Sequence, residues 1–327
     1  MSIKTKLTKE LGIPHPIMLA PMDVVADARL TAAVSNAGGL GLLGGGYGDE
    51  QWLTRELDLL TTLNAPYGVG FITWSLAKQP KLLDLVLERR PSAVMLSFGD
   101  PEPFVERIRR AGATVICQVQ SVALAKEAVA AGSDILVAQG TEAGGHGASR
   151  GLVTLVPEVV DAVRSEIPIV ASGGIADGRG LAAALMLGAS GVLMGTRFYA
   201  TREAAGAEAA KRRICAATGD DTLRSILFDI SRRNVWPAPF TGRCLRNAHL
   251  ERWNGREVEL FQCVDEESTK YFAARSEGNF DIAAIIAGES AGLVRDIVSA
   301  RDVVERIIRE ASEALGHATS RFEVAEA

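Results

Sequence analysis

The chain has 327 residues, of which 47% are hydrophobic and 23% are charged, enough apolar material for one large core or for a large and a small one. A net charge of -5 and a pI near 5.6 argue against nucleic acid or an anionic membrane surface as the main partner. The four cysteines lie far apart and form no C-x-x-C pair, which argues against a zinc site and against a disulfide framework.

Targeting signals are weak in this sequence. The amino terminus is charged but carries no apolar segment of signal-peptide length before Pro14, so a cytoplasmic location is expected. The most apolar segment, 180–196, is interrupted by Gly188, Ser190 and Gly191 and falls short of the roughly 18 uninterrupted apolar residues of a membrane span. It is better interpreted as a helix, a turn and a strand.

Short apolar runs alternate with segments of helical period along the first 200 residues. The runs predict strands at 15–20, 40–43, 67–73, 93–98, 114–119, 135–138, 168–171 and 191–194. Helices are predicted between them at 26–37, 49–63, 81–89, 101–111, 121–131 and 152–164, and a further helix begins near Asp177 or Gly178.

The strands are apolar throughout rather than alternating, as in a parallel sheet that is covered on both faces or closed on itself. About eight such β-α units predict an α/β fold, a (β/α)8 barrel. A doubly wound open sheet is the alternative fold. However, the first strand is followed by Pro21-Met-Asp-Val, which lacks the G-x-G-x-x-G of dinucleotide-binding sheets.

The alternation of predicted strands and helices stops after about Glu203, and this change predicts a domain boundary. We expect a barrel over 1–204, a smaller and mainly helical lid or substrate domain over 205–286, and a segment over 287–327 that returns to the barrel. The last segment contains an amphipathic helix predicted at 294–315 and a loose tail. In the middle segment, arginines alternate with acidic residues, a pattern typical of a solvated surface; the acidic residues are Asp220, Asp221, Asp229 and Glu251.

A glycine-rich stretch at 138–151 contains the candidate catalytic residue, His146. It lies between a predicted strand and a predicted helix, so we expect His146 on a strand-to-helix loop flanked by Gly144, Gly145 and Gly147. Glycines let the backbone approach a ligand closely, and an imidazole can take a proton near neutral pH. On its own, a Gly-Gly-His sequence is more often a turn with a solvated histidine.

Two further glycine motifs favour a ligand-binding role for the His146 loop over a solvated turn. Ser172-Gly173-Gly174 follows the predicted seventh strand, and Gly195-Thr196 follows the eighth. In (β/α)8 enzymes the active site lies at the carboxyl ends of the strands, and phosphate commonly binds between the loops after strands seven and eight. Each motif alone is an ordinary turn, but together they predict a phosphate site that shares its ligand with the His146 loop.

Several motifs together resemble the nitronate monooxygenase family, formerly called 2-nitropropane dioxygenases. The similarity runs from near Pro14 to about Ser290 and is weakest between 205 and 285. The motifs that carry it are Ala20-Pro-Met22, Ala33-Val-Ser-Asn-Ala-Gly-Gly-Leu-Gly41, Gln139-Gly-Thr-Glu-Ala-Gly-Gly-His-Gly147, Ala171-Ser-Gly-Gly-Ile-Ala-Asp-Gly-Arg-Gly180, Gly195-Thr-Arg-Phe198 and Gly288-Glu-Ser-Ala-Gly-Leu293.

The resemblance implies that FMN binds non-covalently at the mouth of the barrel and that alkyl nitronates are oxidised with O2 to nitrite and a carbonyl compound. It also implies site residues. His146 would act on or bind the substrate, Ser290 would lie near it, and the cofactor would contact Met22, Gln118, Gly145, Ser172, Gly173, Gly174, Gly195 and Thr196. One position departs from the family, because Gly70 stands where relatives often have Asn.

A neutral nitroalkane must lose its α-proton before it can donate electrons, and His146 is the histidine placed to act as that base. His15, His249 and His317 lie in a turn, in the second domain and in the tail. A nitronate needs no base, and His146 would then help to hold its oxygens. No metal is expected, and a homodimer is the working expectation for assembly.

Two other functions remain open at the level of sequence. FMN-dependent enoyl-acyl-carrier-protein reductases and NADH:quinone reductases share the fold, and the former carry the same Ala-Gly-Gly-His loop. A non-catalytic FMN-binding protein is the third reading.

Overall fold

The structure is a computed structural model that describes residues 2–163 and 167–316. Eight parallel strands form its main sheet, in the order β1-β9-β8-β6-β5-β4-β3-β2. Their bounds are β1 Ile17–Leu19, β2 Gly41–Gly44, β3 Tyr67–Ile72, β4 Ala93–Ser97, β5 Thr114–Val119, β6 Ile135–Gln139, β8 Ile169–Ser172 and β9 Gly191–Met194.

The sheet closes into a barrel between its first and last strands. Leu40, the residue before β2, bridges Met18 of β1 in parallel. The Leu19 amide donates to the Leu40 carbonyl and the Leu40 amide donates to the Ile17 carbonyl, each at 2.9 Å. The predicted (β/α)8 barrel is therefore confirmed, and the open-sheet alternative is wrong.

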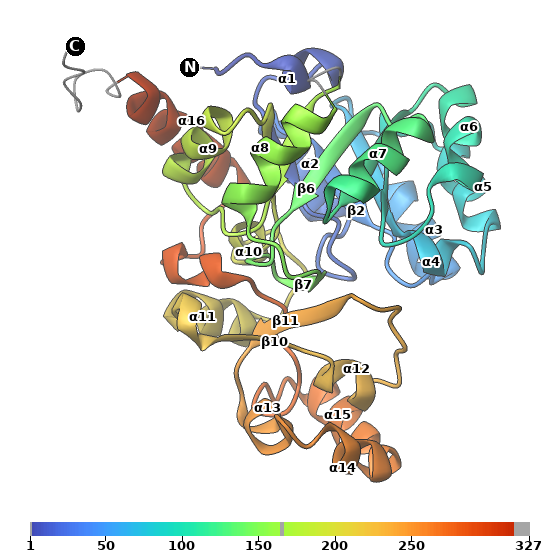
Figure 1. Cartoon of the computed structure of the whole chain (residues 1–327), viewed down its shortest axis with the longest axis vertical. Helices are drawn as coiled ribbons and strands as arrows, with labels where there is room; N and C mark the ends of the chain where they lie inside the picture. Colours follow the sequence, from blue (N-terminus) through green and yellow to red (C-terminus); the bar gives the residue numbers. More distant parts are fainter. Residues whose placement is uncertain (1, 164–166, 317–327) are drawn as a thin grey trace.

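Helices follow the strands and cover the outside of the barrel (Figure 1). Those of the barrel are α1 Lys6–Glu10, α2 Ala28–Asn36, α3 Glu50–Leu60, α4 Thr73–Leu76, α5 Lys81–Glu88, α6 Glu102–Arg110, α7 Val122–Ala130, α8 Leu152–Ala162, α9 Gly178–Met186 and α10 Thr196–Tyr199. Side-chain caps fix several of their starts: Asp27, Asp49, Ser121 and Asp177 each accept a hydrogen bond from the amide three residues on.

Two apolar clusters build the barrel core. The inner cluster fills the barrel with side chains such as Met18, Leu42, Met95, Ile116 and Val170, and the apolar side of α1 joins it. The outer cluster lies between the strands and the surrounding helices. Because the inside of the barrel is filled, a ligand has room only at its mouth.

The chain between the barrel and the last helix forms a second part, below the barrel in Figure 1. It contains the helices α11 Glu208–Ala216, α12 Leu227–Ser231, α13 Ala248–Trp253, α14 Glu257–Gln262 and α15 Val264–Glu277, and the strands β10 Thr222–Ser225 and β11 Thr241–Leu245. It has an apolar cluster of its own around Phe228, Leu250, Trp253, Leu260 and Tyr271.

The last helix returns to the barrel. After the short 3-10 turns η1 Gly219–Asp221 and η2 Glu289–Leu293, the helix α16 Ala300–Gly316 packs against α9 and α2. The Gly178 amide donates to Glu310 of α16 at 2.9 Å. A side chain at Gly178 would overlap the Glu310 Cβ and the Ala311 backbone, so this glycine permits the close approach of the two helices.

Three predicted elements need correction. The 205–286 segment, expected to be mainly helical, also contains two strands, because β10 and β11 pair antiparallel within it. The helix expected at 294–315 begins only at Ala300, since Val294 ends a 3-10 turn in extended conformation. The third is the His146 loop, which contains the short strand β7 Gly145–Gly147. The helix expected at 152–164 is found as α8, while Arg164 and the predicted tail lie outside the described residues.

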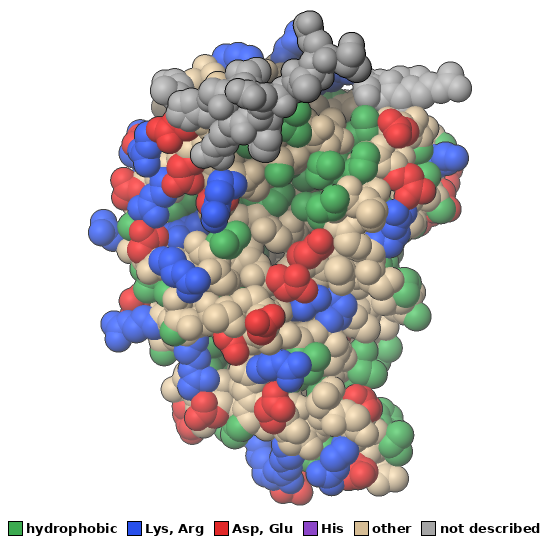
Figure 2. Space-filling view, turned by 60° about the vertical axis from the view of Figure 1, so that its left-hand side comes forward, with side chains coloured by type: hydrophobic (Ala, Val, Ile, Leu, Met, Phe, Trp, Pro, Cys, Tyr) green, Lys and Arg blue, Asp and Glu red, His purple; other side chains and the backbone are tan. Residues whose placement is uncertain are grey.

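On the face shown in Figure 2, acidic and basic side chains are interspersed over both parts of the molecule. This face therefore has no large patch of one charge that would favour a strongly charged partner. Within residues 2–163 and 167–316, no helix has the length and apolarity needed to cross a bilayer.

Candidate active site

The loops that follow β6, β8 and β9 meet at one end of the barrel. The Gly288 amide donates to Thr196 Oγ1 at 2.9 Å, which ties the segment before η2 to the end of β9. Gly144 lies against the backbone of Gly288, and a Cβ at Gly173 would be 3.0 Å from the Ala143 amide nitrogen. The three predicted glycine motifs therefore do converge, and the 287–290 segment joins them.

His146 lies in β7, which is the edge strand of a three-stranded sheet and pairs antiparallel with β11. The side-chain amide of Gln139 anchors the backbone of this strand. Its Nε2 donates to the His146 carbonyl at 2.9 Å, and its Oε1 accepts from Gln120 Nε2 at 2.9 Å. Thus the barrel strand β6 and the second part of the chain both hold the segment that carries the imidazole.

The imidazole itself has two close partners. Its Nε2 lies 2.9 and 3.0 Å from the two carboxylate oxygens of Asp229, on α12. Its ring stacks on the Trp236 indole, with 3.4 Å between centroids and 7° between planes. Neither partner was singled out in the sequence, and Asp229, expected on a solvated surface, is buried instead.

The position of Trp236 locates the imidazole over the barrel mouth. Its indole Nε1 donates to Tyr47 Oη at 3.0 Å, and its ring meets the rings of Trp74 and Phe98 edge to face. Tyr47, Trp74 and Phe98 follow β2, β3 and β4, whereas His146 comes from the loop after β6, across the barrel. The imidazole therefore reaches from one side of the mouth toward the other.

Arg224 of β10 clamps the His146 loop. Its guanidinium donates to the carbonyls of Thr141, Ala143, Gly145 and Thr241. Burial, and next the neighbouring Arg243, lower the pKa of Arg224 to about 10, so it stays charged at neutral pH. The carbonyl oxygens accept hydrogen bonds from Arg224, but they do not neutralise its positive charge. The guanidinium therefore contributes positive potential to the site.

The pKa of His146 is lowered from its ordinary value of 6.5. Burial is the main cause, and the cations Arg232 and Arg224 act in the same direction. The hydrogen bond and charge of Asp229 oppose this shift. The imidazole is therefore mostly neutral at neutral pH, which is the form that can accept a proton.

The described residues fit a flavin phosphate and ring. The backbone amides of Gly173, Gly174, Gly195 and Thr196 donate to no described residue, although all four lie where the glycine motifs meet. Such convergent free amides are the donors that bind phosphate. The Gln118 Nε2, at the end of β5, is fully buried and also lacks a partner. Met22 lies beside Gly195, where an added Cβ would be 3.5 Å from its Sδ.

The remaining predicted residues have clear places. Ser172 ends β8 and is buried, and Gly145 begins β7 with a φ of 73°. Ser290 lies within η2 and is buried, with 5% of its surface exposed. At Gly70 a side chain would overlap the Pro21 ring, which accounts for the absence of Asn there.

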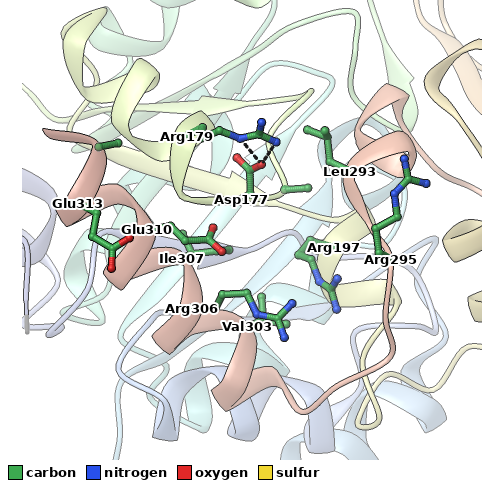
Figure 3. Close-up of a pocket in the computed structure, with 12 residues that line it drawn as sticks. Asp177, Arg179, Arg197, Leu293, Arg295, Val303, Arg306, Ile307, Glu310 and Glu313 are labelled. Carbon is green, nitrogen blue, oxygen red and sulfur yellow. Dashed lines mark hydrogen bonds and ion pairs between the residues drawn. The ribbon is translucent and has the colours of Figure 1, made fainter. Parts of the chain in front are cut away.

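The structure also has a cavity, and none of the predicted site residues lines it. It is a cavity of about 420 Å³ between α9, α16 and the chain after η2 (Figure 3). Its buried cation, Arg197, already donates to Asp296 and to the Ala200 carbonyl, and Arg179 pairs with Asp177. Neither His146 nor its partners Asp229 and Trp236 line this cavity.

Comparison with known families agrees with this geometry. The family model described as nitronate monooxygenase matches residues 4–79 and 63–310. The chain belongs to the nitronate monooxygenase family. It is an oxidoreductase of a family whose members generally depend on a flavin.

Two curated relatives differ in name. The nitronate monooxygenase npaC of Metarhizium robertsii is 37% identical, over 91% of this chain and 91% of that protein. An octahydroindene-carboxyl-CoA dehydrogenase of Mycobacterium tuberculosis is 31% identical, over 99% of this chain and 100% of that protein. The family is thus shared by proteins named for different substrates.

Two solved structures have the same fold over nearly the whole chain. FabK from Thermotoga maritima has a TM-score of 0.87 and 30% identity, and covers 98% of this chain and 100% of its own. A nitroalkane oxidase from Streptomyces ansochromogenes has a TM-score of 0.82 and 28% identity, and covers 96% of this chain and 100% of its own.

Proposed function

We propose that this protein oxidises alkyl nitronates, and the corresponding nitroalkanes, with O2, and that it uses FMN to produce a carbonyl compound and nitrite. The observation that supports this most is the position of His146, held over the mouth of a barrel whose strands β8 and β9 end in free backbone amides. The family match over most of the chain points to the same reaction.

We assign the cofactor contacts as follows. Amides of Gly173, Gly174, Gly195 and Thr196 would hold the FMN phosphate, with Ser172 beside them, while Met22, Gln118 and Gly145 would lie near the ring system. A bound flavin supplies a two-electron acceptor that O2 can reoxidise. Backbone amides suit a phosphate because several of them can donate hydrogen bonds to its oxygens at once.

The protein's own groups act on the substrate. A nitronate carries its negative charge on the nitro oxygens, and Arg224 and Arg232 bring positive charge toward His146. His146 would contact the substrate, and Ser290, buried in η2, would line the same region. For a neutral nitroalkane, the neutral imidazole would take the α-proton.

The proposal is tested with purified holoprotein. Its absorption spectrum should be that of a flavoprotein, and heat-released cofactor should be FMN by chromatography. Addition of ethylnitronate should consume O2 and release nitrite. Absence of O2 uptake at saturating FMN would refute the proposed reaction.

A reductase is the second candidate, because FabK from Thermotoga maritima and the CoA dehydrogenase cover nearly the whole chain. An enoyl-acyl-carrier-protein reductase or NADH:quinone reductase would share the barrel, FMN and His146. Anaerobic NADH or NADPH would then bleach the flavin rapidly, whereas ethylnitronate would not. A non-catalytic FMN-binding protein would respond to neither.

We also propose the division into a barrel over 1–204, a smaller domain over 205–286 and a returning segment over 287–327. The separate apolar cluster around Phe228 and Tyr271 supports it. A homodimer and a cytoplasmic location remain predictions, and sedimentation and fractionation would test them.

A further inference from the structure

The carboxylate of Asp229 is paired with the imidazole of His146 in a buried setting. Both side chains are 9% exposed, and the Nε2 to oxygen distances are 2.9 and 3.0 Å. The two residues come from different parts of the chain, β7 and α12, and lie 83 positions apart. Gly242 lies opposite His146 in β11, and a Cβ there would be in ordinary contact with Nε2, at 3.5 Å.

This pairing decides which ring nitrogen is basic. An ionised carboxylate can only accept a hydrogen bond, so a neutral imidazole must place its proton on Nε2. The lone pair is then on Nδ1. The Nδ1 atom bonds to no described residue, and it is not among the fully buried atoms that lack a partner. Some of its surface is therefore exposed, which a proton acceptor needs.

The ring cannot easily turn to exchange its two nitrogens. Gln139 holds the His146 carbonyl, Arg224 holds the Gly145 carbonyl, and Trp236 covers one ring face. Titratable groups surround the pair: Arg224 from β10 and Arg232 after α12 act on His146, while Arg232, Tyr47 and Cys244 lie near Asp229. The two cations oppose protonation of the imidazole, and Asp229 is the group that favours it.

We propose that Asp229 is a positioning residue: it holds the Nε2 proton of His146, so that the α-proton removal assigned above to this histidine takes place at Nδ1. This inference rests on the proposed function. In the step, the substrate α-C–H bond breaks, its proton bonds to Nδ1, and the electron pair stays on the substrate, which becomes the nitronate. Asp229 then faces an imidazolium and stabilises it.

The test separates proton removal from oxidation. Wild type and Asp229→Asn are assayed with freshly dissolved neutral nitroethane and, separately, with ethylnitronate prepared in base. We expect Asp229→Asn to lower kcat/KM for nitroethane by about 100-fold, the lower end of what general-base catalysis contributes, because His146 remains but its imidazolium loses the carboxylate that stabilises it. The value of kcat/KM for ethylnitronate should be unchanged. With α-deuterated nitroethane, the isotope effect on kcat/KM should increase in the variant, because C–H cleavage becomes more fully rate-limiting.

The matched control is Asp265→Asn, which removes an exposed acid of the same part of the chain that pairs with Arg233. It should leave both substrates unaffected. Flavin content is measured for each variant, to show that the site is intact. Equal losses with both substrates, or no loss with nitroethane, would overturn the role of Asp229. If wild type oxidises neither substrate, the proposed function fails instead.

Discussion

Trp236 and His146 lie face to face, with 3.4 Å between ring centroids and only 7° between ring planes. Trp236 belongs to the segment between α12 and β11, whereas His146 belongs to the loop after β6. One face of the imidazole is therefore covered by the second part of the chain. Reagents and substrates must reach the imidazole at its other face or at its edge.

Removal of this cover should expose His146 to chemical modification. In Trp236→Ala we expect faster carbethoxylation of His146 by diethyl pyrocarbonate than in wild type, because the indole no longer shields the ring. Peptide mapping by mass spectrometry would follow each histidine. Trp236→Phe keeps an aromatic ring and should react nearly as slowly as wild type. An unchanged rate in Trp236→Ala would show that the stack does not limit access.

Gly173 should matter for FMN in a way that a strained glycine elsewhere does not. Its φ of 110° disfavours any side chain, and a Cβ would be 3.0 Å from the Ala143 amide. Gly112, with a φ of 79° and open space around it, provides the control. We expect Gly112→Ala to cost about 1 kcal/mol of unfolding free energy through backbone strain alone, and Gly173→Ala to cost more because of the close contact with Ala143. Only Gly173→Ala should raise the Kd for FMN in a titration of the apoprotein, and equal FMN affinities would contradict the phosphate assignment.

The fold was largely predictable, and the environment of His146 was not. The apolar runs that became β3, β4 and β5 are local signals, because a strand buried on both faces needs continuous apolar residues. The strand β7 has no such signal: Gly145-His-Gly147 becomes a strand only because β11, about 100 residues later, pairs with it. In the sequence, Asp229 cannot be told apart from the surface acids around it. Only the packing of α12 brings its carboxylate to the imidazole.

Two aromatic residues of the second part of the chain do carry a signal in the sequence. Trp236 and Phe240 flank the proline-rich turn of a segment otherwise poor in strand or helix signals, and large aromatic side chains there predict contact with another surface. Arg224 gives no comparable hint, since its partners are carbonyl groups that every sequence has.

Arg224 should be essential for the structure of the glycine-rich loop. Its guanidinium serves four carbonyls, and Arg224→Gln would leave several of them unpaired. We expect a loss of about 3 kcal/mol of unfolding free energy, measured by urea denaturation, because each buried unpaired carbonyl is costly. Arg212→Gln, at an exposed position of α11, should cost little. Similar small losses in both variants would be evidence against the clamp.

Gly178 should control the return of the last helix to the barrel. A Cβ at this position overlaps the Glu310 side chain and the Ala311 backbone, so Gly178→Ala must push α16 away from α9. We expect a loss of roughly 1–3 kcal/mol, the usual cost of overpacking, seen as a lower Tm. Gly316→Ala, with nothing near its added Cβ, is the control and should leave the Tm unchanged or raise it slightly. A normal Tm for Gly178→Ala would mean that the two helices pack less closely.

The pKa of His146 predicts how activity and stability depend on pH. Its value in the folded protein lies below 6.5, mainly through burial, so the unfolded chain binds the proton more readily. Stability from this residue is therefore present above about pH 6.5 and declines as pH falls below it. His15 and His249 are also shifted downward and add losses of the same sign, so His146→Gln is compared with wild type to isolate one residue.

Activity with neutral nitroethane should show the same ionisation, because only the neutral imidazole can take the proton. The acid limb of kcat/KM should have its midpoint below pH 6.5. In Asp229→Asn the limb should move to still lower pH, since Asp229 raises the pKa while Arg224 and Arg232 lower it. A pH–rate profile of both proteins, with flavin content matched, measures the two midpoints. A midpoint above pH 6.5 in wild type, or a shift to higher pH in the variant, would mean that a group other than His146 controls the rate.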